Sequence, residues 1–142
     1  MKNNKPAIIM LILLIIITLA GAALVVFVKQ ADQVSAQKEP SIDDILEASV
    51  DIQQITTNLK NDNFIRVSFK IQTDGKKAKK ELEKREFQVK NIIIQELSEM
   101  NPEDIQGREG QTQLQEMLKN KINEYMQTGK IVQVYITESL LQ

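Results

Sequence analysis

Two residue types that carry much of protein chemistry are absent from this chain, which contains no cysteine and no histidine. The absence of cysteine excludes disulfides, thiol nucleophiles, sulfur-ligated metals and acylation of an N-terminal cysteine. The absence of histidine removes the most frequent general base and the most frequent metal ligand. We therefore expect a protein that is not an enzyme, with no catalytic residues, no metal site and no cofactor.

Basic residues are outnumbered by acidic ones beyond the N-terminal region. Lys2, Lys5 and Lys29 account for three of the 18 Lys and Arg residues, and all 19 acidic residues follow Lys29. The remainder therefore has 15 basic residues and a net charge of −4. Because proteins bind nucleic acids largely by neutralising phosphates with Lys and Arg, we expect no nucleic acid as a partner. The sequence also has no pocket signature for a small-molecule substrate.

A long uncharged segment lies near the start of the chain. Residues 7–28 contain no charged side chain, and Thr18 is their only polar one. A helix of this length spans about 33 Å, which matches the hydrocarbon core of a bilayer at about 30 Å. The segment therefore predicts one transmembrane helix. Two lysines precede it and one follows, which predicts that residues 1–6 are cytoplasmic and that the rest of the chain lies outside the plasma membrane.

A cleaved signal peptide is the alternative, because Val34, Ser35 and Ala36 resemble a small-residue cleavage site. The apolar cores of signal peptides are about 7 to 15 residues long, so the longer segment here favours a permanent anchor. Residues 29–48 then form a juxtamembrane linker, unless the first part of this stretch prolongs the anchor helix. Within it, Ser41 and Asp44 have the spacing of a capping pair and predict a brief helix.

Residues 49–142 predict one small α+β domain. The first strand, residues 49–59, alternates in two pieces whose phases disagree at Gln53 and Gln54, which predicts a β-bulge. After a polar turn, residues 65–72 alternate strictly between apolar and polar side chains. That alternation is typical of a half-buried strand, here the second strand of a hairpin.

Two amphipathic helices and a third strand follow the hairpin. A helical pattern runs from Gly75 to Met100, and a second apolar stripe runs from Leu114 to Met126, with Gly129 as its expected C-cap. Residues 131–141 are rich in β-branched side chains, and this strand can pair only with the hairpin. The expected order is ββααβ, with both helices on one face of an antiparallel sheet.

Two motifs suggest chemistry but have simpler explanations. Ser35 and Lys38 have the S-x-x-K spacing of penicillin-recognising enzymes, but the accompanying S-D-N and K-T-G motifs are missing. Asp43, Asp44 and Glu47 resemble a cluster of metal ligands. Carboxylates at a helix N-terminus are, however, explained by about 0.3 to 1 kcal/mol of stabilisation from the helix dipole. We assign no catalytic, cofactor or metal residue.

The one dense basic cluster has two interpretations. In the first, the cluster contacts anionic lipid headgroups or an acidic partner surface. In the second, which we favour, it is a solvated face balanced by nearby glutamates. The lysines are Lys76, Lys77, Lys79 and Lys80, and the glutamates are Glu81, Glu83 and Glu86.

Four further residues have special positions. Phe64 and Tyr135 fall out of phase with the buried side chains of their strands, so each either contacts a partner or another copy, or is covered within the domain. Gly107 and Gly110 predict backbone with positive φ or a close approach.

Together these features resemble the FliL family, the flagellar basal body-associated membrane proteins. The resemblance rests on the N-terminal anchor, on the two predicted hairpin strands and on the end of the long helix. It is most specific in the last third of the chain. The residues that carry it are Asn58, Leu59, Ile65, Leu97, Ser98, Gly110, Leu114, Ile122, Asn123, residues 129–138 and Gln142. The chain departs from the family pattern in its strongly charged first helix and in Met100, Asn101 and Pro102.

The resemblance implies an auxiliary protein of the flagellar motor without enzymatic activity. It implies association with the basal body and the ion-driven stator, and a role in swimming, swarming and chemotaxis. It further implies a stomatin-like extracytoplasmic domain that forms a ring-like homo-oligomer. A general stomatin-like membrane scaffold unrelated to flagella is the alternative, and a membrane-bound hydrolase that uses Ser, Lys and carboxylates is a third hypothesis.

Overall fold

The computed structural model describes residues 5–34 and 39–142. The chain divides into two compact units, and the boundary between them in the sequence lies between Glu39 and Pro40. The motif of Ser35 and Lys38 lies outside the described residues, as do Ser35 and Ala36 of the expected cleavage site.

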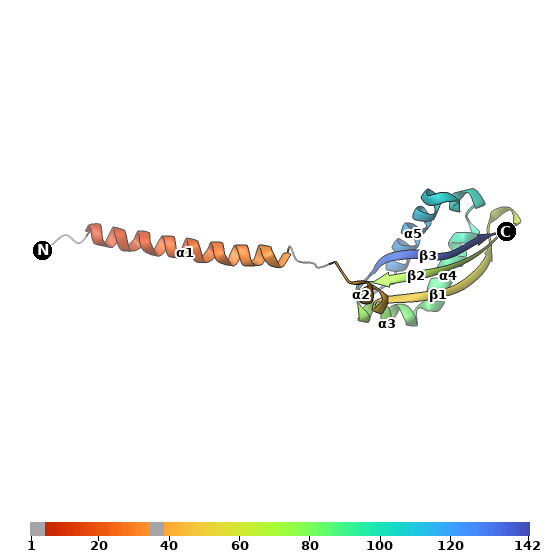
Figure 1. Cartoon of the computed structure of the whole chain (residues 1–142), viewed down its shortest axis with the longest axis horizontal. Coiled ribbons are helices and arrows are strands. Elements are labelled where there is room, and N and C mark those ends of the chain that lie inside the picture. Colours follow the sequence, from red (N-terminus) through yellow and green to blue (C-terminus); the bar gives the residue numbers. More distant parts are fainter. Residues whose placement is uncertain (1–4, 35–38) are drawn as a thin grey trace. The chain divides into compact units, whose positions relative to one another are not determined.

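The first unit contains one helix, α1 (Lys5–Val34), which is longer than the predicted anchor (Figure 1). From Lys5 to Val26 it is long and apolar enough to cross a membrane, and none of that stretch is buried against other parts of the protein. A core helix of a soluble domain buries one face, whereas the stretch from Ile8 to Val26 exposes its large apolar side chains all round. These properties agree with a membrane anchor. The helix continues to Val34, so the beginning of the expected linker is helical.

The second unit begins with the short helix α2 (Ile42–Glu47), which has the predicted capping pair. The Ser41 hydroxyl accepts a hydrogen bond from the backbone N–H of Asp44 (3.2 Å), and the Asp44 carboxylate accepts one from the backbone N–H of Ser41 (3.0 Å). These reciprocal bonds satisfy two N–H groups that a helix start leaves without partners. The Ser41 hydroxyl also donates a hydrogen bond to the Asp44 carboxylate (2.6 Å), and this bond, together with the one from the Ser41 backbone N–H, lowers the pKa of Asp44 because both favour the ionised form.

Three antiparallel strands form the predicted sheet, in the order β1 (Ser49–Asn58), β2 (Phe64–Thr73) and β3 (Ile131–Leu141). The register of β1 against β2 shifts between Ile52 and Ile55, so the bulge at the two glutamines is confirmed. A single-turn 3-10 helix, η1 (Lys60–Asp62), connects these strands.

Helices cover one face of the sheet (Figure 1). On the central strand β2, Ile65, Val67, Phe69 and Ile71 are buried, whereas the alternate side chains from Phe64 to Lys70 are exposed or half-buried. The core between sheet and helices also includes buried side chains from each of the long helical segments. They are Leu82, Val89, Ile93, Leu97, Leu114, Leu118 and Ile122.

The prediction of one helix from Gly75 to Met100 is wrong. The chain forms α3 (Lys76–Lys84) and α4 (Glu86–Ser98), with a break at Arg85, which has φ −92° and ψ 6°. The break lets α3 contact both β1 and β2 while α4 runs beside β1. Between β2 and β3 the described chain therefore has three α-helices instead of two. The last is α5 (Gly107–Asn123), which follows the 3-10 helix η2 (Pro102–Ile105).

The helix expected to end near Gly129 ends earlier, at Asn123. Leu114, Leu118 and Ile122 form the predicted buried stripe, but Tyr125 lies beyond the helix and is exposed. The reason is that the Asn123 side chain bonds to the backbone of Ile131, which turns the chain toward β3.

The prediction that Gly107 and Gly110 have positive φ or a close approach of the backbone is confirmed. Gly107 has a φ of +70°, a conformation that residues with a Cβ rarely adopt. Gly110 has ordinary φ, but a Cβ there would overlap the backbone carbonyl of Asp104. Gly110 therefore lets α5 pack directly on the preceding turn.

Candidate interaction surface

Two of the three carboxylates of α2 have partners within the domain. Asp44 caps its own helix, and the carboxylate of Glu47 lies 2.9 Å from the ammonium group of Lys76 on α3. Among residues 5–34 and 39–142, no group of three or more His, Cys, Asp or Glu side chains is arranged to hold a metal ion. Of the three acidic side chains of α2, Glu47 is the one that links this helix to α3.

The basic cluster of α3 separates into two parts with different environments. Lys76 pairs with the carboxylate of Glu47, and Lys79 donates a hydrogen bond to the backbone carbonyl of Glu47 (3.1 Å), so these two lysines hold α2. Lys77 and Lys80 are exposed, and Lys84 is exposed on the next turn of the same helix.

Two of the three glutamates expected to balance this cluster have other partners, and the third, Glu83, is exposed. Glu86 pairs with Lys90 (2.6 Å), and Glu81 pairs with Arg85 (2.8 Å). Neither pair involves a lysine of the cluster. Intrahelical pairs four residues apart are the ordinary use of such charges, but here they leave the positive charge of Lys77 and Lys80 facing solvent.

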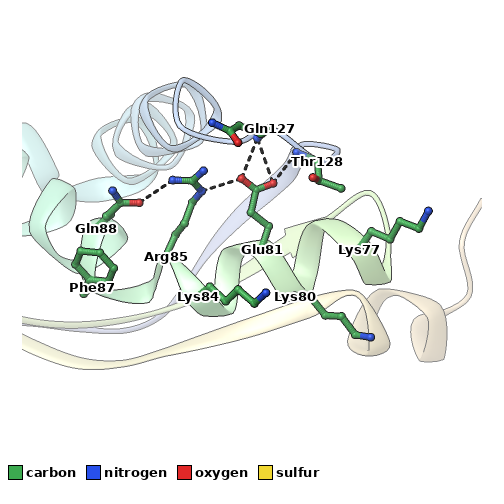
Figure 2. Close-up of a pocket in the computed structure, with 9 residues that line it drawn as sticks. All are labelled: Lys77, Lys80, Glu81, Lys84, Arg85, Phe87, Gln88, Gln127 and Thr128. Atoms are coloured by element: carbon green, nitrogen blue, oxygen red, sulfur yellow. Dashed lines mark hydrogen bonds and ion pairs between the residues drawn. The ribbon is translucent and has the colours of Figure 1, made fainter.

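Glu81 links α3 to the loop that precedes β3, as Figure 2 shows. Its carboxylate accepts hydrogen bonds from Arg85 Nε (2.8 Å) and from the backbone N–H groups of Gln127 (3.0 Å) and Thr128 (2.6 Å). The hydrogen bond from Arg85, together with those two backbone N–H groups, lowers the pKa of Glu81 despite partial burial of the carboxylate. The side chain is only 14% exposed, so its charge is directed into the protein.

Two adjacent depressions lie beside this link. The first has a volume of about 520 Å³, and its lining includes Lys77, Lys80 and Lys84 (Figure 2). The second has a volume of about 460 Å³, and its lining includes Tyr125. Phe87 and Gln88 line both depressions, so the basic depression and the aromatic one are adjacent. We call the two together the α3–α4 groove, with a basic end and an aromatic end.

The uncovered face of the sheet carries the two aromatic residues noted in the sequence. Phe64 is 51% exposed and Tyr135 is 40% exposed, so neither is covered within the domain. The Tyr135 hydroxyl donates a hydrogen bond to Gln72 (3.0 Å). Leu140 lies on the same face, opposite Arg66, and the sequence analysis missed it. A register shift in β3 between the partners of Ser68 and Phe69 moves Leu140 to this face, and simple alternation does not reveal that shift.

The described residues thus define a class of protein: a small α+β domain, preceded by an apolar helix that suits a membrane anchor. Residues 49–142 match the family described as flagellar basal body-associated protein FliL. The chain is also 47% identical over 124 residues to "Flagellar protein FliL" of Bacillus subtilis (strain 168), and the matched region covers 87% of each chain. The chain belongs to the FliL family, and the resemblance seen in the sequence is confirmed.

Membership places the protein among flagellar basal body-associated proteins with a part in motility. The family consists of flagellar accessory proteins and is not a known family of enzymes.

Proposed function

We propose that this protein is a non-enzymatic accessory of the flagellar motor. It associates with the ion-driven stator and supports the stator in rotating the flagellum. Through the stator it contributes to swimming, swarming and chemotaxis. The observation that carries this proposal is the match of residues 49–142, which include all three strands and helices α3 to α5, to a family associated with the flagellar basal body.

The proposed arrangement in the cell is a single pass through the plasma membrane, with a cytoplasmic N-terminus and an extracytoplasmic domain. Two features support it. The helix α1 is apolar over a length that suits a bilayer, and Lys2 and Lys5 lie at its N-terminal side, as expected for a cytoplasmic flank.

The proposed mechanism is scaffolding by confinement. An anchored domain diffuses in two dimensions beside its partners, which raises its effective concentration, so weak lateral contacts suffice to hold it at the stator. We further propose that the domain is stomatin-like and assembles with copies of itself into a ring. The three-stranded sheet with one covered face and one open face is compatible with such lateral packing.

Deletion of the gene tests this function. The deletion strain should assemble flagellar filaments but swim more slowly and form smaller swarms, and a full-length copy should restore both. A copy without residues 2–34 but with a cleavable secretion signal should fail to restore them, because the domain is no longer confined to the membrane. Normal motility of the deletion strain would exclude the motor function.

The competing hypothesis is a general membrane scaffold, which deletion of the gene in a strain without flagella tests. Such a protein would be needed for other membrane processes whether or not flagella are present. Growth and membrane-stress phenotypes in a strain without flagella would therefore support the scaffold over the motor accessory.

A further inference from the structure

We propose that the α3–α4 groove is a docking site for an acidic peptide segment of a partner protein, one that also carries a large apolar side chain. The inference rests on the proposed function for the location of the partner, outside the cytoplasm at the motor. The recognition itself follows from the chemistry of the groove.

The basic end of the groove presents three lysines on one side of α3. Lys77, Lys80 and Lys84 are spaced by three and four residues, so their side chains project from the same helix face. All three are exposed, and within residues 5–34 and 39–142 none of them forms an ion pair. Lys77 and Lys80 also lie in the first half of α3, where the helix dipole adds positive potential. An anionic ligand placed here relieves the mutual repulsion of the three lysines.

Glu81 does not neutralise these lysines. It is the single carboxylate that lines the basic end, and its oxygens accept hydrogen bonds from Arg85, Gln127 and Thr128. In Figure 2 its side chain points toward that loop, whereas Lys80 and Lys84 extend away from it. The groove therefore presents cations to a ligand while its own anion is already bound.

The other end of the groove is aromatic. Phe87, in the first turn of α4, is 72% exposed, and the exposed Tyr125 lines the same second depression. Ile92 also lines this second depression. Large exposed aromatic side chains beside a concave surface are typical of protein-binding sites.

The shape and the surrounding charges favour a peptide over a lipid surface. Two depressions joined at Phe87 suit an extended chain, whereas a bilayer is flat on this scale. In addition, α2 is fastened to α3 through Lys76 and Glu47, and its Asp43 and Asp44 are exposed. An anionic bilayer resting on this side of the domain would meet those carboxylates as well as the lysines.

Selection from a library of random 12-residue peptides tests the proposal. The target is the full-length protein in nanodiscs of phosphatidylcholine, which carry no net charge, and empty nanodiscs remove background binders. We expect the enriched peptides to be rich in Asp and Glu and to contain at least one aromatic or large aliphatic residue. Their dissociation constants, measured by fluorescence anisotropy, should rise by at least about tenfold in the Lys80→Glu/Lys84→Glu variant, because attraction becomes repulsion.

Matched variants separate loss of the groove from loss of the fold. Lys80→Gln/Lys84→Gln should weaken binding by an intermediate factor, and Phe87→Ala should weaken it by roughly threefold to tenfold. Arg108→Glu and Phe64→Ala change an exposed cation and an exposed aromatic residue elsewhere, and should leave binding within about twofold. Circular dichroism must show the same helix content in every variant that is compared.

Three outcomes would overturn the proposal: no enrichment above empty nanodiscs, enriched peptides without excess acidic residues, or acidic peptides that bind the double variant as well as the wild type. Failure of the proposed function is visible separately. If acidic peptides bind the groove but the deletion strain swims normally, the docking site is supported and the motor function is excluded. If motility depends on the protein but the Lys80→Glu/Lys84→Glu variant binds every selected peptide as well as the wild type does, the docking site is excluded and the motor function is supported.

Discussion

The side-chain amide of Asn123 forms two hydrogen bonds with the backbone of Ile131. Its Nδ2 group donates to the carbonyl oxygen of Ile131 (3.1 Å), and its Oδ1 accepts from the Ile131 N–H (2.7 Å). The amide thereby ends α5 and fixes the first residue of β3 beside it. Both residues belong to the C-terminal pattern that resembles the FliL family, so part of that pattern has a structural role.

Replacing Asn123 should therefore destabilise the domain. Asn123→Ala removes two partly buried hydrogen bonds and leaves the backbone groups of Ile131 without these partners, so the free energy of unfolding should fall by about 1 to 3 kcal/mol. Urea unfolding followed by circular dichroism measures the change. Asn120→Ala, on an exposed position one turn earlier in α5, should change the value by less than about 0.5 kcal/mol. Equal effects of the two substitutions would contradict this role.

The link between Glu81 and the loop before β3 should make stability depend on pH. The pKa of Glu81 is lower in the folded protein than the ordinary value of 4.5, so the ionised carboxylate stabilises the fold above pH 4.5. That contribution is lost as the pH falls below 4.5 through the folded-state pKa. The difference in unfolding free energy between the wild type and Glu81→Gln should thus shrink as the pH is lowered through this range.

Thermal melts of both proteins across a series of pH values between neutral and acidic measure this effect. Glu83→Gln, which removes an exposed carboxylate from the same helix, is the matched control. A stability difference for Glu81→Gln that stays constant through acidic pH would mean that the charge of Glu81 does not hold the loop.

A side chain at Gly110 should lower the stability of the domain. In Gly110→Ala the new Cβ overlaps the carbonyl of Asp104, so η2 and α5 must move apart, at a cost of about 1 to 3 kcal/mol. Gly75→Ala is the control, because a Cβ there meets no atom within 4 Å. A melting temperature of Gly110→Ala equal to that of the wild type would show that the turn shifts without cost.

Local sequence patterns predicted the strands well because those patterns record burial directly. The alternation from Ile65 to Ile71 matches the buried face of β2, and the phase conflict at Gln53 and Gln54 marked the bulge in β1. The break at Arg85 was not predictable in the same way. Leu82 and Val89 are seven residues apart, so the apolar spacing continues across the break as it would in a straight helix.

The groove was not predictable either, because its parts come together only in the folded domain. Glu81 bonds to Gln127 and Thr128, which are more than 40 residues away in the chain. The favoured interpretation of the lysine cluster assumed that nearby glutamates balance it, but tertiary contacts decide which lysines are paired. Lys76 and Lys79 bind the end of α2, and Lys77 and Lys80 do not.

The absence of cysteine makes the proposed membrane topology directly testable. Single cysteines at Asn3 and at the exposed Glu103 can be introduced into a chain that has no other thiol. In intact cells, a membrane-impermeant maleimide should label Glu103→Cys but label Asn3→Cys only after the membrane is opened. The reverse pattern would invert the topology, and recovery of the protein in the soluble fraction would exclude the anchor.

The most direct test of the central claim, that this is a membrane-anchored accessory of the flagellar motor, is the position of the protein in living cells. A functional fluorescent fusion of the full-length chain should be imaged together with a labelled basal-body protein. The account predicts discrete foci that coincide with basal bodies and disappear in cells that make none. An even distribution over the cell membrane, unchanged in cells without basal bodies, would contradict it.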